Sequence, residues 1–125
     1  MFIRNRQKTE LSAYMWQHFE DRMVEHVNQF FPRKTAKMGD AQVRKAIREG
    51  GVKATDYFIE RECDVAKFID LKFAIHMDFD THEELPWVQE ILTNHSQTGE
   101  EKIDRIYAEL PGRLRALQAQ SKPKS

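Results

Sequence analysis

The sequence predicts an all-α protein, a single-domain bundle of five to seven helices with a long N-terminal helix. Apolar residues recur at the 3.6-residue spacing of a helix along most of the chain. Glycine and proline are sparse, at five and four of 125 residues, and they fall between the periodic segments. We therefore expect one helical domain over residues 1–120 and a disordered tail over residues 121–125.

Proline and glycine positions divide the first half of the chain into three predicted helices. Pro32 ends the first helix, because the residue before a proline is pushed out of the helical region. Gly50 and Gly51 end the second helix, because glycine tolerates the left-handed conformation that closes a helix. The predicted order is a helix over residues 9–31, a loop over 32–39, a helix from Asp40 to the glycines and a helix over 52–62.

The second half of the chain holds the predicted centre of the core. Apolar residues cover well over half of the circumference of a helix over residues 64–77, so this helix should pack on several sides. Lys72 lies within the apolar arc. We expect its stem to pack along the core with the amine in water, or the amine to pair with Asp70 or Asp56. A short helix beginning near Pro86 and a last helical stretch, kinked or divided at Pro111, complete the bundle.

The segment AIHMDFDTHEELPW, residues 74–87, carries two histidines and two aspartates at alternate positions. In a turn between two helices, Asp80 or Thr81 would cap the following helix, and Glu83 and Glu84 would lie at its positive end. We expect this capped turn. In an extended segment the alternate side chains would point the same way, and the alternative is therefore a divalent metal site formed by His76, Asp78, Asp80 and His82.

The remaining reactive side chains favour structural roles. Cys63 is the single cysteine, so no intramolecular disulfide can form. Its acidic neighbours disfavour a reactive thiolate, so we expect a packed thiol at a helix start rather than a nucleophile. His26 lies in the apolar stripe of the first helix, where a histidine is more often hydrogen-bonded at the edge of the core than catalytic. The sequence therefore predicts no catalytic residues and no cofactor.

Charge and composition exclude several classes of partner. Lysine plus arginine and aspartate plus glutamate both number 20, so the balanced charge gives no global attraction to nucleic acid. No apolar run reaches the roughly 18 residues of a membrane helix. The first residues lack the apolar segment of a secretory signal. We expect a cytoplasmic protein that binds neither nucleic acid nor membrane.

Several phrases of the chain resemble a family of small bacterial all-helical proteins whose genes lie beside type VI secretion effectors. The likeness covers most of the chain, in FIRNRQ, LSAYMWQHFEDRMVEHVNQFFP, IREGGVKATDYFIERECDVAKFIDLKFAI and FDTHEELPWVQEIL. The chain departs from the family at Phe58 and His76, where glycine is usual, and at Lys72, where methionine is usual. The resemblance implies association with an effector.

These observations together predict a non-catalytic protein that binds another protein. The leading hypothesis is an immunity protein that neutralises a toxin, and the alternative is an adaptor or chaperone that loads an effector. A small metal-binding protein is the hypothesis from a different class. Acidic side chains would pair with a basic surface of the partner, and the predicted contacts are Asp78, Asp80, Glu83 and Glu84.

Overall fold

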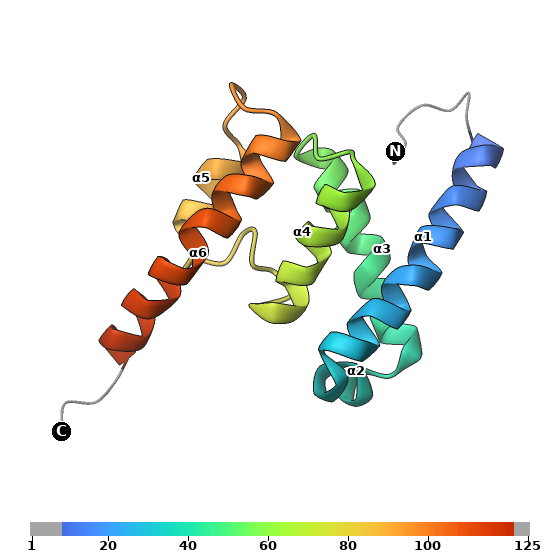
Figure 1. Ribbon diagram of the computed structural model, residues 1–125, viewed down its shortest axis with the longest axis horizontal. Coiled ribbons are helices and arrows are strands. Elements are labelled where there is room, and N and C mark those ends of the chain that lie inside the picture. The colour runs from blue at the N-terminus through green and yellow to red at the C-terminus, as the bar shows by residue number, and fades with distance from the viewer. Residues whose placement is uncertain (1–8, 122–125) are drawn as a thin grey trace.

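Helices make up most of the described chain, which confirms the all-α prediction. The computed structural model describes the backbone of residues 9–121 and the side chains of residues 13–116. Six helices lie in this part of the chain, within the predicted range, and they form one unit (Figure 1). They are α1 (Thr9–Phe30), α2 (Pro32–Met38), α3 (Asp40–Asp56), α4 (Glu62–Ala74), α5 (Pro86–Leu92) and α6 (Gly99–Ser121).

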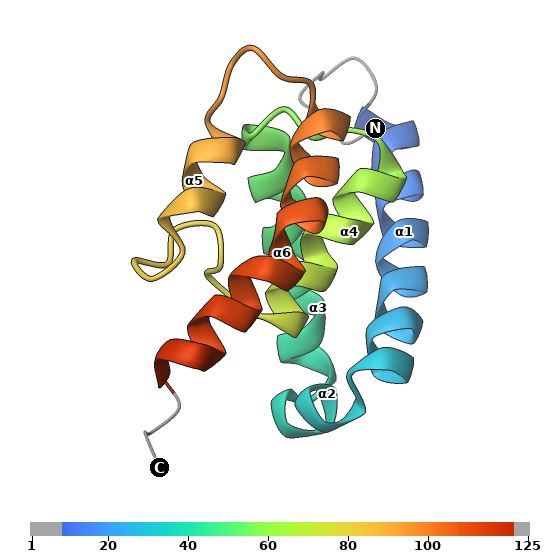
Figure 2. The same ribbon diagram turned by 60° about the vertical axis from the view of Figure 1, so that its left-hand side comes forward.

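The α4 helix lies at the centre of the bundle, as its apolar circumference predicts. It contacts α1, α3 and α6, and Figure 2 shows α4 between α1 and α6. The α5 helix packs against α6 on the outside of this arrangement. Burial of large apolar side chains is the main stabilising contribution to such a core, and the fully buried ones on α4 are Phe68, Ile69, Leu71 and Phe73.

Two adjacent glycines allow α1 and α4 to approach α3 closely. A Cβ atom at Gly51 would lie 2.2 Å from the Trp16 ring of α1, and one at Gly50 would lie 2.8 Å from the side chain of Ile69 on α4. The prediction that these glycines end a helix is therefore wrong, because α3 continues through them to Asp56. Their function is to leave room for neighbouring side chains.

Two further boundaries differ from the sequence-based expectation, and a third agrees with it. Residues 32–38 form the short helix α2 rather than a loop, with Pro32 at its first turn, where a missing N–H does no harm. The helix expected over residues 52–62 does not form: α3 ends before Tyr57, and Phe58 takes a left-handed φ of 65°. The last helix is a single one that contains Pro111 and bends in Figure 2, which is the kinked form of the two that were expected.

Two lysines bind backbone carbonyl groups where helices end. The Nζ atom of Lys102 donates to the carbonyl of Tyr57 at 2.8 Å, just beyond the end of α3, and that of Lys34 donates to the carbonyl of Phe73 near the end of α4. Carbonyl groups at a helix C-terminus have no partner within the helix, and the negative end of the helix dipole favours a cation. These amines therefore stabilise the helix ends, Lys102 from a buried position and Lys34 from the surface.

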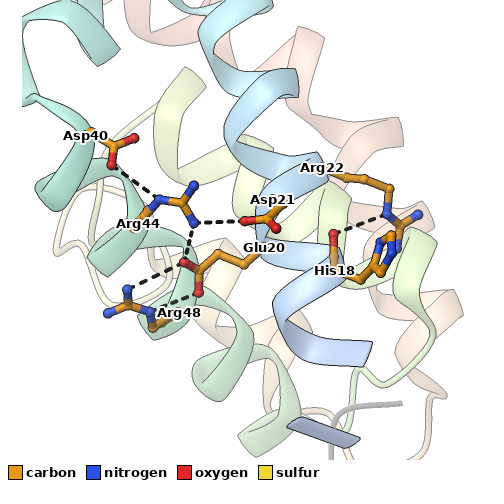
Figure 3. A network of polar contacts seen from close by, with 7 residues as sticks. All are labelled: His18, Glu20, Asp21, Arg22, Asp40, Arg44 and Arg48. Atoms are coloured by element: carbon orange, nitrogen blue, oxygen red, sulfur yellow. Dashed lines mark hydrogen bonds and ion pairs between the residues drawn. The ribbon is translucent and has the colours of Figure 1, made fainter. Parts of the chain in front are cut away.

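An ionic network joins α1 to α3 (Figure 3). The carboxylate of Glu20 on α1 accepts hydrogen bonds from Arg44 Nη1 at 2.8 Å and from Arg48 Nε at 2.9 Å. Arg44 also reaches Asp21 on α1 and Asp40 on its own helix, at 3.0 and 3.3 Å. Because Glu20 is only 5% exposed, its charge depends on these two arginines for stabilisation.

Candidate functional site

The connection between α4 and α5, residues 75–85, is called the elbow below, and it is a series of turns. Backbone hydrogen bonds close these turns, from Phe79 N–H to the His76 carbonyl and from Leu85 N–H to the His82 carbonyl, at 3.0 and 2.9 Å. Phe79 is fully buried, with its ring 4.9 Å from that of Phe68. The elbow is thus anchored in the core. The predicted turn forms, but neither Asp80 nor Thr81 caps α5, whose N-cap residue is Leu85.

The two histidines of the elbow stabilise its turns. The Nδ1 atom of His76 accepts a hydrogen bond from the N–H of Asp78 at 3.0 Å, and the Nδ1 atom of His82 accepts one from the N–H of Glu84 at 3.1 Å. The two rings meet edge to face, with centroids 4.6 Å apart. One ring nitrogen of each histidine is therefore occupied by the backbone of the elbow itself.

Asp80 points into the protein rather than out of the elbow. Its carboxylate oxygen Oδ2 accepts hydrogen bonds from Lys53 Nζ at 2.6 Å and from the Tyr57 hydroxyl at 2.8 Å, and the residue is only 3% exposed. Burial raises the pKa of the Tyr57 phenol, and the hydrogen bond to Asp80 raises it further. Asp80 therefore joins the elbow to α3, which corrects both its predicted role as a helix cap and its predicted exposure to a partner.

The alternative metal site is not assembled in the described structure. Asp80 is paired inside the bundle, and each histidine uses Nδ1 within its own turn. Residues 13–116 contain no group of three or more histidine, cysteine, aspartate or glutamate side chains placed to hold a metal ion. This alternative requires the alternation of side chains found in a strand, which successive turns do not have.

The other three predicted contact residues are on the surface. Asp78, Glu83 and Glu84 are exposed. Within the described part of the chain, none of them forms an ion pair. The α5 helix has Leu85 as its N-cap residue, without a side-chain hydrogen bond. The elbow therefore presents three exposed carboxylates that form no ion pair with another described residue.

A groove of about 410 Å³ lies between the outer face of α3 and the elbow. Its α3 wall includes Glu49 and Val52, and Val52 is 62% exposed although it is apolar. Its elbow wall includes Met77 and Asp78, so the groove is continuous with the acidic surface of the elbow. A concave surface with both apolar and charged walls is a common form of binding site.

The cationic side chains that line the groove already have partners. Arg48 contacts Glu20, Lys53 contacts Asp80, and Lys72 donates from Nζ to the Met77 carbonyl at 3.1 Å. Burial lowers the pKa of the Lys72 amine, and the nearby carboxylates of the groove oppose this shift. The amine of Lys72 therefore lies inside the protein, bound to the elbow, and neither reaches water freely nor pairs with Asp70 or Asp56 as expected.

The two remaining reactive residues have different outcomes. His26 Nε2 lies 2.9 Å from a carboxylate oxygen of Asp70, which confirms a hydrogen-bonded histidine at the edge of the core. Cys63 is exposed, and its sulfur accepts a hydrogen bond from Arg61 at 3.3 Å, so the prediction of a packed thiol is wrong. The buried apolar side chains of α4 begin at Val65, so Cys63, near the start of the helix, stays at the surface.

Sequence reasoning missed the α3 wall of the groove. The wall residues follow the i, i+3, i+4, i+7 pattern of one side of a helix, at Glu49, Val52, Lys53 and Asp56. That signal was hidden by the expectation that the two glycines divide the segment. The pairing of this side of α3 with the elbow depends on how the helices pack and is not readable from spacing.

Comparison of the chain with protein-family models, with curated proteins and with solved structures finds no match. Among the described residues, no helix has the length and apolar character needed to cross a bilayer. The site itself is therefore the basis for a functional proposal. The fold and the groove together describe an all-helical protein with an acidic, partly apolar recess on one side.

Proposed function

We propose that the protein binds another protein, through the elbow and the groove beside it. The observation that carries this proposal is the set of exposed elbow carboxylates, Asp78, Glu83 and Glu84, which have no ion-pair partner in the described part of the chain. Charge left unpaired at a surface steers and specifies association with a partner of opposite charge. The partner surface is therefore basic.

The resemblance to proteins encoded beside type VI secretion effectors supports an effector as the partner. In the leading form of the proposal, the protein is a cytoplasmic immunity protein that covers the active site of a toxin acting in the same compartment. In the second form, it is an adaptor that holds an effector until delivery. Neither form requires a catalytic residue in this chain.

Purification with the product of the neighbouring gene tests the proposal. We expect a stable complex of the two untagged proteins in size-exclusion chromatography at physiological salt. Deleting the gene separates the two forms, because loss of immunity poisons sibling cells whereas loss of an adaptor leaves the effector inside the producer. Absence of both the complex and the two phenotypes would remove the proposal.

A further inference from the structure

We propose that the groove between α3 and the elbow receives one arginine side chain from the bound protein. This inference rests on the proposed function, because the partner supplies the side chain. It goes further by naming the chemistry of the contact, the place where it forms and the residues of this chain that make it.

The groove has room for a long side chain and an apolar surface to receive it. Its volume of about 410 Å³ falls in the range of small-molecule sites. Val52 offers an exposed apolar wall, and Met77 of the elbow lies among the lining residues as well. The aliphatic stem of an arginine packs on apolar surface of this kind while its charged end remains near polar groups.

The free charge of the groove is negative. Its cations are held by Glu20, by Asp80 and by the Met77 carbonyl, as described above. Glu49 on α3 and Asp78 on the elbow are exposed carboxylates that form no ion pair with another described residue, and both attract the Lys72 amine through space. An entering cation is therefore attracted to these two exposed carboxylates rather than to the buried Lys72 amine, which would repel it.

Arginine fits this pair of carboxylates better than lysine does. A guanidinium group carries five N–H donors in a planar fork, so it can bind two carboxylates at once. The neighbouring elbow residues Glu83 and Glu84 extend the negative surface beyond the groove and favour the approach of a basic segment. Apolar contact, charge and donor geometry thus indicate the same occupant.

Titration of the ¹⁵N-labelled protein with a short peptide tests this inference by NMR. The probe is acetyl-Gly-Ser-Arg-Ser-Gly-amide, and the matched control peptide carries citrulline, an uncharged isostere, in place of arginine. We expect saturable shift changes centred on the amides of Glu49, Val52 and Asp78, with the citrulline peptide binding at least about fivefold more weakly.

Protein variants locate the contact. The double variant Glu49→Gln with Asp78→Asn should weaken binding of the arginine peptide by about fivefold, since it keeps the shape of the groove and removes its free charge. Glu25→Gln, an exposed carboxylate of α1, is the matched control and should change nothing. Equal binding of the two peptides, shifts centred elsewhere or the absence of saturable shifts would overturn the inference.

The outcomes separate this inference from the proposal on which it rests. If the neighbouring gene product forms the complex but the arginine peptide does not perturb the groove, the groove contact is wrong and protein binding stands. If the peptide occupies the groove as described but no complex forms, the recognition chemistry stands and the effector partner is wrong.

Discussion

The two sides of α3 use charged residues in different ways. On the side facing α1, Glu20 is buried between Arg44 and Arg48, and every charge of the network has a partner (Figure 3). On the side facing the elbow, Glu49 and Asp78 are exposed without an ion pair in the described part of the chain. One helix thus carries a surface that holds the bundle together and a surface that is available to a partner.

The contrast shows that charge composition alone does not identify a binding surface. The two sides of α3 contain similar residue types, and only the fold decides which carboxylates are neutralised internally. Paired charges near the interior contribute to stability, whereas exposed unpaired charges contribute little to it and more to association. Variants on the two sides should therefore separate effects on stability from effects on binding.

The largest loss of stability is expected where α1 and α3 meet. Gly51→Ala places a methyl group 2.2 Å from the Trp16 ring, and we expect it to lower the free energy of unfolding by about 3 kcal/mol. Chemical denaturation monitored by circular dichroism measures the change. Combining Gly51→Ala with Trp16→Leu should recover most of the loss, because the smaller side chain leaves space for the methyl group.

The matched control for this prediction is Gly112→Ala in α6. The nearest atom to the added methyl group there is Arg115 Nη2, 3.9 Å away, so no clash arises. Because alanine is the better helix former, this variant should instead gain about 0.5–1 kcal/mol. Equal effects of the two substitutions would contradict the account of the close approach at Gly51.

The attachment of the elbow to α3 should give the next largest effect. Lys53→Met removes the ammonium group that lies 2.6 Å from Asp80 Oδ2 and leaves a buried carboxylate with Tyr57 as its remaining partner. We expect a loss of about 2 kcal/mol, reduced from the fully buried case because Lys53 is partly exposed. Lys45→Met, an exposed lysine of the same helix, serves as control in thermal denaturation and should stay within about 0.5 kcal/mol of the parent.

The same isosteric change, glutamate to glutamine, made once on each side of α3 compares the two sides directly. Glu20→Gln removes a buried carboxylate that two arginines bind, and it should cost about 1.5 kcal/mol of stability. Glu49→Gln removes an exposed carboxylate and should change the unfolding free energy by less than about 0.5 kcal/mol. A larger loss at Glu49 than at Glu20 in urea denaturation would reverse the assignment of the two surfaces.

The smallest effect concerns alkaline pH. Burial and Asp80 raise the pKa of Tyr57, and burial raises the pKa of Tyr107. An unfolded tyrosine ionises near pH 10, so above that pH the unfolded state holds fewer protons and the unfolding free energy falls as pH rises. Buried Lys72 and Lys102, whose pKa values are lowered by burial, act in the opposite direction below pH 10.5.

A comparison of variants isolates the contribution of Tyr57. Tyr57→Phe should reduce the alkaline proton release linked to unfolding by about one proton, which makes the decline in stability shallower. Phenolate absorbance at 295 nm, recorded in folded and denatured samples between about pH 9 and 12, measures this proton release. An unchanged slope would show that Tyr57 already ionises in the folded protein.

Much of the fold was predictable from hydrophobic periodicity. The apolar circumference of α4 correctly placed that helix at the centre, and the sparse glycines and prolines correctly indicated an all-α chain. Gly50 and Gly51 misled the prediction, because a glycine that ends a helix and a glycine that admits a neighbouring helix look the same in sequence. Only the position of Trp16 in space distinguishes the two uses.

The candidate site was predictable in part. The acidic elbow was identified from residue types, and Asp78, Glu83 and Glu84 are exposed there. The opposite orientation of Asp80 depends on Lys53 and Tyr57, which lie more than 20 residues away in sequence and meet it only through packing. The α3 wall of the groove was missed because Gly50 and Gly51 were expected to divide the helix that carries it.

Calorimetric titration of the neighbouring gene product into charge-reversed variants tests the central proposal most directly. Asp78→Lys combined with Glu84→Lys should raise the Kd by about tenfold or more at physiological salt, while Glu25→Lys on α1 should leave it within about twofold. Circular dichroism should show the same helical content for all three proteins. Equal affinity of the elbow variant and the parent would contradict the assignment of the elbow and groove as the binding surface.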